Sequence, residues 1–268
     1  MGHCARRELE YLIMEFVDTH CHIQFADYPL DSTEVIKAAS TAGVSRLIAV
    51  GCTVTDSELS VKMAEKNKNV WASIGLHPHE GSVYVNDTSA LQRFRDLAEK
   101  DKVIAIGETG LDYHYMHSSK DDQQKLLRFQ LDLASQYDLP VIFHVRQAFD
   151  DFWEIFDQYQ GLRGVVHSFT ADNNVLDEIL ARDLFVGING IMTFTKDKHQ
   201  LEAAKAIPLQ KLLLETDAPF LTPTPYRGTI CEPKHVVVTA EFLAELRNET
   251  LAALSKQTTT NARELFGI

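Results

Sequence analysis

Two histidines stand at the end of a short apolar run near the start of the chain. His20 and His22 follow Phe16 and Val17 at a spacing of i and i+2. On a strand, residues i and i+2 point to the same side, so both imidazoles would reach one metal ion together. An HxH pair alone is a weak signal, because a single histidine at a strand end more often has a structural role. The specificity of the prediction depends on further ligands elsewhere in the chain.

Four more segments carry a possible metal ligand at or just after an apolar run. These ligands are Glu108 after VIAIG, His144 at the end of PVIFH, His167 at the end of GVVH, and Asp217 two residues after KLLLE. Imidazole and carboxylate ligands without thiolate suit zinc, manganese, magnesium or iron, and disfavour a structural zinc site. Six ligands are too many for one ion with an open position, so we expect two ions bridged by Glu108. Such a pair lowers the pKa of a bound water and stabilises the attacking and leaving oxygens of a hydrolysis.

Three neighbouring residues are candidates for accessory roles. His79 follows Pro78 after the run VWASIG, and would orient substrate or water unless the segment is only a rigid turn set by Pro78. Arg146 lies two residues past His144 and would bind a phosphate through two hydrogen bonds, or else form a surface ion pair. Glu215 precedes Asp217 by two residues and would hydrogen-bond to the metal ligands from behind.

The remaining histidines do not lie at the end of a predicted strand. We interpret them as loop or surface residues: His3, His114, His117, His199 and His235. Cys21 lies between two expected ligands and would point to the opposite side, which favours a small buried filler over a ligand.

The elements that must position these ligands are short apolar strands that alternate with helices. We predict eight strands, at Phe16–His20, Arg46–Gly51, Val70–Gly75, Val103–Gly107, Pro140–His144, Gly164–His167, Leu184–Ile188 and Lys211–Glu215. Alternating strands and helices indicate a parallel sheet, and the lack of polar alternation indicates that helices cover it. Eight such units match a single-domain (β/α)8 TIM barrel over residues 14–268, with residues 1–13 as an N-terminal extension outside the fold. In such barrels the carboxyl ends of the strands converge on the active site.

Composition limits the classes of function. The net charge of −12 over 268 residues argues against a protein that coats nucleic acid, because it repels phosphate backbones. It leaves room for an enzyme acting on nucleic acid, since divalent ions reverse the local charge of a cleft. No apolar stretch approaches the roughly 20 residues that span a bilayer, and the four cysteines form no CxxC pair. We therefore expect a soluble cytoplasmic protein with no membrane association and no obligate protein partner.

Together these motifs resemble the TatD-type metal-dependent deoxyribonucleases, within the amidohydrolase-like TIM barrels. The resemblance runs in order from Phe16 to Gly267. It is carried by VDTHCH (17–22), GLHPH (75–79), GETGLD (107–112), HVR (144–146), HSF (167–169), ETDAP (215–219), Arg227-Gly228, Glu232-Pro233 and TNARELFG (260–267). Cys231 is a departure, because the family usually has Asn before Glu-Pro.

The resemblance implies a cytoplasmic, magnesium-stimulated nuclease, often a 3′–5′ exonuclease on single-stranded DNA and sometimes on RNA. The family's metal ligands match six positions: His20, His22, Glu108, His144, His167 and Asp217. The expected cofactors are two divalent ions, with Mg²⁺ favoured over Mn²⁺ or Zn²⁺, and the expected substrate is single-stranded DNA or a 3′ end. We assign Asp217 and Glu108 the catalytic roles, with Asp217 taking the proton from the attacking water.

Two alternatives stay open at this point. The ligand set alone does not separate phosphodiesters from small ester or amide substrates hydrolysed on the same barrel. The lysines considered as bridging ligands, Lys62, Lys102 and Lys211, lie away from the strand ends, which weighs against a carboxylated-lysine amidohydrolase. A metal-dependent scaffold without catalysis is the second alternative. No obvious aromatic stacking platform for single strands is apparent, although Phe169, Phe194, Phe220 and Tyr226 lie near expected strand-end loops.

Overall fold

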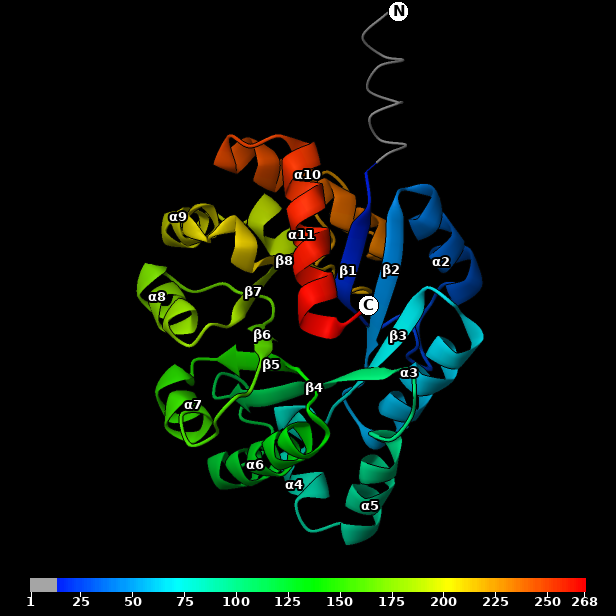
Figure 1. The fold of residues 1–268 in the computed structure, drawn as a ribbon, viewed down its shortest axis with the longest axis vertical. Coiled ribbons are helices and arrows are strands. Elements are labelled where there is room, and N and C mark those ends of the chain that lie inside the picture. Colours follow the sequence, from blue (N-terminus) through cyan, green and yellow to red (C-terminus); the bar gives the residue numbers. More distant parts are fainter. Residues whose placement is uncertain (1–13) are drawn as a thin grey trace, which may run out of the picture.

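The computed structural model describes residues 14–268, so the predicted N-terminal extension at residues 1–13 lies outside the described residues. Within residues 14–268, eight strands form one parallel sheet in the order β1 to β8, surrounded by helices (Figure 1). The strands are β1 (Phe16–Cys21), β2 (Val44–Val50), β3 (Val70–Ile74), β4 (Val103–Asp112), β5 (Val141–Arg146), β6 (Gly164–Val166), β7 (Phe185–Ile188) and β8 (Leu212–Leu214). This arrangement confirms the predicted (β/α)8 barrel.

The fourth strand is longer than predicted. β4 continues past Gly107 to Asp112, and its last residues pair with β5, as Gly110 with His144 and Asp112 with Arg146. Polar residues ended the apolar run in the sequence, but their backbones still pair with the neighbouring strand while their side chains reach the barrel mouth. Glu108 is thus held within a strand rather than in a loop.

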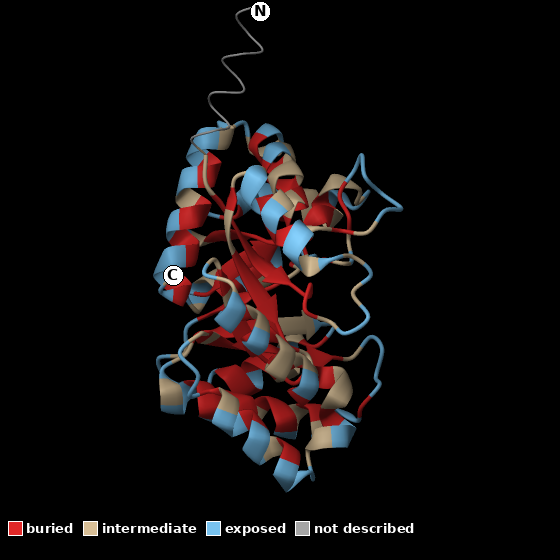
Figure 2. Cartoon of the chain, turned by 90° about the vertical axis from the view of Figure 1, so that its right-hand side faces the viewer, coloured by how far each residue is buried: buried red, intermediate tan, exposed pale blue. Residues whose placement is uncertain are grey.

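Most helices begin at a side chain that accepts hydrogen bonds from the free N–H groups of the first turn. Such caps are Asp31, Thr53, Asp87, Ser119, Asp172, Asp197 and Thr250. The helices are α2 (Ser32–Thr41), α3 (Val54–Lys66), α4 (Gly81–Tyr84), α5 (Thr88–Leu97), α6 (Lys120–Tyr137), α7 (Phe149–Phe156), α8 (Asn173–Ala181), α9 (Lys198–Ala206), α10 (Val236–Arg247) and α11 (Leu251–Phe266), with short 3-10 turns at Pro78–Glu80, Gly190–Thr193, Leu209–Lys211 and Pro233–His235. Figure 2 shows their exposed faces outward and their buried faces against the sheet.

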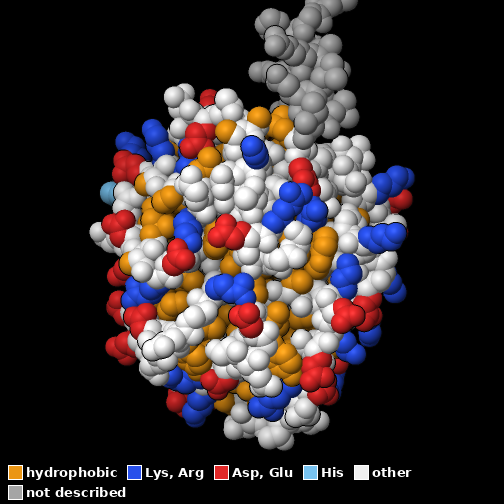
Figure 3. All heavy atoms as spheres, in the orientation of Figure 1, with side chains coloured by type: hydrophobic (Ala, Val, Ile, Leu, Met, Phe, Trp, Pro, Cys, Tyr) orange, Lys and Arg blue, Asp and Glu red, His pale blue; other side chains and the backbone are white. Residues whose placement is uncertain are grey.

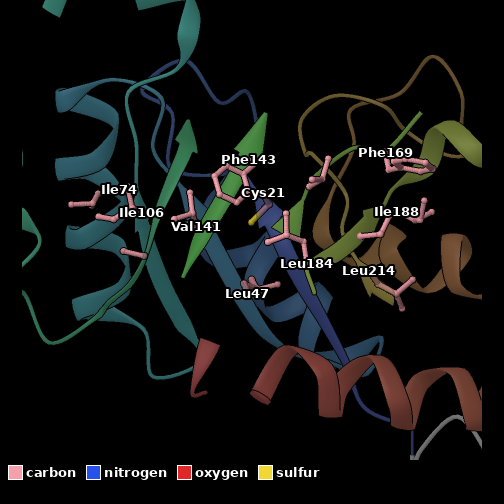
Figure 4. Close-up of a cluster of buried hydrophobic side chains, with 14 of the residues drawn as sticks. Cys21, Leu47, Ile74, Ile106, Val141, Phe143, Phe169, Leu184, Ile188 and Leu214 are labelled. Carbon is pink, nitrogen blue, oxygen red and sulfur yellow. The ribbon is translucent and has the colours of Figure 1, made fainter. Parts of the chain in front are cut away.

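The core has two parts. The larger fills the space between strands and helices, and Figure 4 shows Cys21 among its side chains. Cys21 is fully buried, as predicted for a filler. The smaller part lies inside the barrel, where Val17, Ile48 and Leu213 meet Leu265 and Phe266 of α11. Helix α11 therefore closes one end of the barrel and leaves the carboxyl ends of the strands to form the other.

The first and last strands are joined mainly through side chains and loops. Asp18 accepts hydrogen bonds from the backbone N–H of Thr216 at 2.9 Å and from its hydroxyl at 2.6 Å. The backbone N–H groups of His22 and Asp217 donate to the carbonyls of Ala218 and His20, respectively. These contacts place the residues after β8 beside the end of β1.

The surface is mixed in charge on the face that carries α11, where Figure 3 shows basic and acidic side chains interspersed. None of the helices within residues 14–268 has the length and apolar character that crossing a membrane requires.

Candidate metal centre

The six predicted ligands come together at the carboxyl ends of the strands. We call this group the metal centre: His20, His22, Glu108, His144, His167 and Asp217. His20 lies in β1, Glu108 in β4 and His144 in β5; His22 and His167 directly follow β1 and β6, and Asp217 lies three residues after β8. Their convergence across five strands is what the barrel prediction required.

One half of the metal centre is built around the histidine pair on β1. Nε2 of His20 and Nε2 of His22 lie 3.0 Å apart. Oδ1 of Asp217 lies 3.5 Å from the first and 3.3 Å from the second. Oε2 of Glu108 lies 3.4 Å and 3.8 Å from the same two nitrogens. Two imidazoles and two carboxylate oxygens therefore surround one point.

The other half uses the second oxygen of the same glutamate. Oε1 of Glu108 lies 2.7 Å from Nδ1 of His144 and 2.8 Å from Nε2 of His167. These two nitrogens are themselves 3.3 Å apart. Each oxygen of Glu108 thus faces a different pair of imidazoles, which is the geometry of a bridging carboxylate.

Groups behind the ligands orient two of the imidazoles. Nδ1 of His22 donates to the carbonyl of Val50 at 2.8 Å, which leaves Nε2 as the free lone pair facing Glu108. Nε2 of His144 donates to Oδ2 of Asp112 at 3.1 Å, which leaves Nδ1 for the metal centre. A carbonyl or carboxylate behind a ligating imidazole is the usual arrangement in metal sites.

Glu215 contacts the segment that carries His167. Its Oε1 accepts a hydrogen bond from the N–H of Ser168 at 2.5 Å and lies 3.6 Å from Nδ1 of His167. Gly187 on β7 makes this possible, because a Cβ there would clash with the Glu215 carboxylate. Glu215 is buried, and together with His20 and His167 it forms a further group whose ligand atoms lie close enough to hold a metal.

Replacing Glu215 by Gln is expected to weaken metal binding by about 10- to 100-fold, the usual range for a group that orients a ligand. The amide keeps the size of the side chain but removes the charge that favours a ligating His167. Titration of metal into the metal-free variant measures the change. Glu154→Gln on the exposed face of α7 is the matched control, and an unchanged affinity for Glu215→Gln would remove this supporting role.

The ionisable groups of the metal centre interact in a way that favours bound cations. Burial alone would raise the pKa of Glu108, but the neighbouring His167 and His77 hold it well below its ordinary value. Burial would lower the pKa of His167, but Glu108 and Glu215 raise it well above its ordinary value. The carboxylates of the site thus favour positive charge on His167, and a cation bound there would compete with its proton. The set of nitrogen and oxygen donors also fits divalent ions.

The structure adds three residues that the sequence did not single out as parts of the site. Nε2 of His77 lies 3.5 Å from Oε1 of Glu108, so His77, Glu108 and His144 form a further group able to hold a metal. The thiol of Cys52 donates to Oε2 of Glu108 at 3.7 Å. Asp112 contacts His144, as above. The sequence motifs GLHPH and GLD could have pointed to His77 and Asp112 as site residues. A single cysteine after a strand, such as Cys52, gives no such indication.

Among the other histidines, one interpretation is wrong. His235 is not a surface residue: it is buried, and its Nδ1 accepts the N–H of Glu232 at 3.0 Å to cap the turn at Pro233–His235. His114, His117 and His199 are exposed, as predicted. His3 lies outside the described residues.

The two candidate substrate-binding residues both lie beside the metal centre. Nε2 of His79 donates to Oδ2 of Asp112 at 3.0 Å, and this oxygen also accepts from His144. Arg146 is exposed at the end of β5, with its guanidinium carbon 4.7 Å from the centre of the Tyr115 ring. Among the described residues, Arg146 therefore packs on an aromatic ring rather than forming the alternative surface ion pair.

Comparison with known proteins identifies the family. Residues 17–267 match the family model described as "TatD related DNase". The chain belongs to the TatD family. A Bacillus subtilis (strain 168) relative named "Uncharacterized metal-dependent hydrolase YabD" is 37% identical over 94% of this chain and 98% of its own length. An Erwinia tasmaniensis relative named "3′-5′ ssDNA/RNA exonuclease TatD" is 33% identical over 94% of this chain and 99% of its own.

A solved structure agrees with these sequence matches. The crystal structure of YJJV, a TatD homologue from Escherichia coli K12, is 29% identical and superimposes with a TM-score of 0.85. The match covers 94% of this chain and 98% of that one. The chain is therefore a metal-dependent hydrolase of the TatD family, folded as a single (β/α)8 barrel.

Proposed function

We propose that this hydrolase cleaves phosphodiester bonds in single-stranded DNA from the 3′ end, and RNA as a second substrate, with two divalent ions, Mg²⁺ being the favoured metal. The observation that carries the proposal is the orientation of Glu108, whose two oxygens face separate imidazole pairs. Two ions bridged in this way suit in-line displacement at phosphorus. The exonuclease name of a 33% identical relative supports the choice of nucleic acid.

The residues of the metal centre divide into distinct roles. Ions held there would acidify a bound water and neutralise charge on the phosphoryl group. Asp217 is partly open to the barrel mouth, with 16% of its side chain exposed, whereas Glu108 is 5% exposed. Asp217 can therefore take the proton of the attacking water, while Glu108 holds the two halves of the centre together. His20, His22, His144 and His167 complete the donor set.

Small esters or amides are the alternative substrates. A carboxylated lysine would favour them, but Lys211 pairs with Asp183, and Lys102 donates to the carbonyls of Lys68 and Val70, away from the metal centre. Glu108, whose two oxygens face separate imidazole pairs, would hold the two ions in place of such a lysine.

Cleavage of end-labelled strands tests the proposal. With Mg²⁺, single-stranded DNA labelled at the 5′ end should shorten stepwise from its 3′ end, while 3′-labelled DNA should release labelled mononucleotide first. RNA and double-stranded DNA are measured in parallel, with Mn²⁺ and Zn²⁺ replacing Mg²⁺. Hydrolysis of a panel of small esters and amides without cleavage of any strand would reject the nuclease assignment in favour of the alternative.

A further inference from the structure

An exposed segment between β4 and α6 lies next to the metal centre. We call residues 114–117 the 114–117 loop: His114, Tyr115, Met116 and His117, all exposed. Tyr115 is 52% exposed, one of the few large hydrophobic side chains of the described chain that face solvent to this extent. An exposed aromatic ring beside a catalytic centre has no role in the core, which makes it a candidate for substrate contact.

Asp112 connects this loop to the metal centre. Its Oδ1 accepts the backbone N–H groups of His114 at 2.9 Å and Tyr115 at 3.0 Å. Its Oδ2 accepts Nε2 of His144 at 3.1 Å. One buried carboxylate therefore sets both the orientation of a metal-centre imidazole and the start of the loop.

The other end of the loop is held as well. The hydroxyl of Ser118 donates to the carbonyl of His79 at 2.6 Å and accepts the N–H of Ser82 at 3.0 Å. The loop is thus attached at both ends to the segment that carries His79. A surface fixed in this way loses little conformational entropy when it binds a ligand.

The side chains around Tyr115 combine aromatic rings with positive charge. The ring of His117 lies 5.8 Å from that of Tyr115 at an interplanar angle of 21°, and the ring of His79 meets Tyr115 edge-on at 5.7 Å. The guanidinium of Arg146 lies over the Tyr115 ring at 4.7 Å. In a chain of net charge −12, this group supplies positive charge and a flat surface at the barrel mouth.

We propose that Tyr115 and His117 stack against a base next to the scissile phosphate, while Arg146 binds the backbone phosphate beside it. This inference rests on the proposed nuclease function and specifies where a nucleotide binds. A flat ring pair recognises the face that all bases share, and a guanidinium matches a phosphate through two hydrogen bonds. The subsite therefore accepts any base and requires that one be present.

Substrates with a missing base test the subsite. Cleavage of intact single-stranded DNA is compared with that of strands carrying one abasic residue at the last or the second-last position. Loss of a single base–aromatic stack typically corresponds to a factor of about 10 or more. We expect Tyr115→Ala to lower kcat/KM by about tenfold on intact DNA, and to add little further loss on the abasic strand that already lacks the stacking base.

Two variants serve as matched controls. Tyr115→Phe keeps the ring and should retain wild-type kcat/KM, whereas Met116→Ala shortens the neighbouring exposed side chain of the same loop without removing a ring. Thermal unfolding checks that each variant is folded. The inference is overturned if Tyr115→Ala cleaves intact DNA like Tyr115→Phe, or if its loss is equal on intact and abasic strands.

Failure of this inference is distinguishable from failure of the proposed function. If wild-type protein cleaves no DNA or RNA in the presence of any of the three metals, the nuclease assignment itself fails. Phe220, an exposed ring in the segment after β8, serves as the comparison. If wild-type protein cleaves DNA but Phe220→Ala, and not Tyr115→Ala, shows the base-dependent loss, the nuclease function stands and the base binds elsewhere.

Discussion

Glu108→Gln is expected to lower hydrolysis by about a thousandfold and to leave the barrel folded. The amide keeps the volume of the side chain, but it cannot present a charged oxygen to each half of the metal centre. Stabilisation of several kcal/mol by paired metals corresponds to a rate factor of this size. Steady-state rates on single-stranded DNA with Mg²⁺ give the loss, and metal analysis of the purified protein shows how many ions remain bound.

A matched variant separates this effect from a general effect of losing a carboxylate. Glu154→Gln, on the exposed face of α7, makes the same chemical change away from the metal centre and should retain full activity. Circular dichroism should show the same helical content in both variants. Wild-type activity in Glu108→Gln would exclude the bridging role, and an unfolded variant would mean that Glu108 acts mainly in stability.

Removal of metal ions is expected to abolish hydrolysis reversibly. The metal centre gathers four imidazoles and two carboxylates, most of them buried, and without cations this set cannot acidify water or neutralise a phosphoryl group. After treatment with EDTA and dialysis, activity should fall below detection. Titration with Mg²⁺, Mn²⁺ or Zn²⁺ should restore it, with a bound stoichiometry of two ions per chain.

Stability should follow metal occupancy. A ligand that binds only the folded state at 100 times its dissociation constant adds about 2.7 kcal/mol to the free energy of unfolding. The midpoint of thermal unfolding should therefore rise when metal is returned to the metal-free protein. A protein that hydrolyses its substrate at full rate in excess EDTA would contradict a metal-dependent mechanism, and a stoichiometry of one would reduce the proposed pair to a single ion.

The sequence predicted the barrel and the group of six ligands because both follow from simple periodic rules. Apolar runs alternating with helices define the strands, and residues directly after those runs must share one rim. Glu108 lies at the barrel mouth even though β4 runs further than its apolar pattern, since the end of the apolar run still marked that rim.

What the sequence could not supply was the set of contacts between side chains distant along the chain. The position of Asp112 in the sequence does not show that one of its oxygens accepts a hydrogen bond from His144 and the other from the 114–117 loop. His235 appeared to be a loop residue because its burial depends on a cap formed within a 3-10 turn. Tyr115 was absent from the aromatic residues considered for stacking, because its exposure beside the mouth depends on the path of a loop without regular periodicity.

The contact between Asp18 and Thr216 has a consequence for the synthesis of the chain. These residues are 198 positions apart, yet they join the beginning and the end of the barrel. On a ribosome, the first strand emerges long before its last neighbour is translated. The nascent protein must therefore hold an incomplete sheet with an open edge, and it gains a complete metal centre only after Asp217 has left the exit tunnel. Pairing between such distant segments slows folding and exposes strand edges, so the barrel is most prone to aggregation during its own translation.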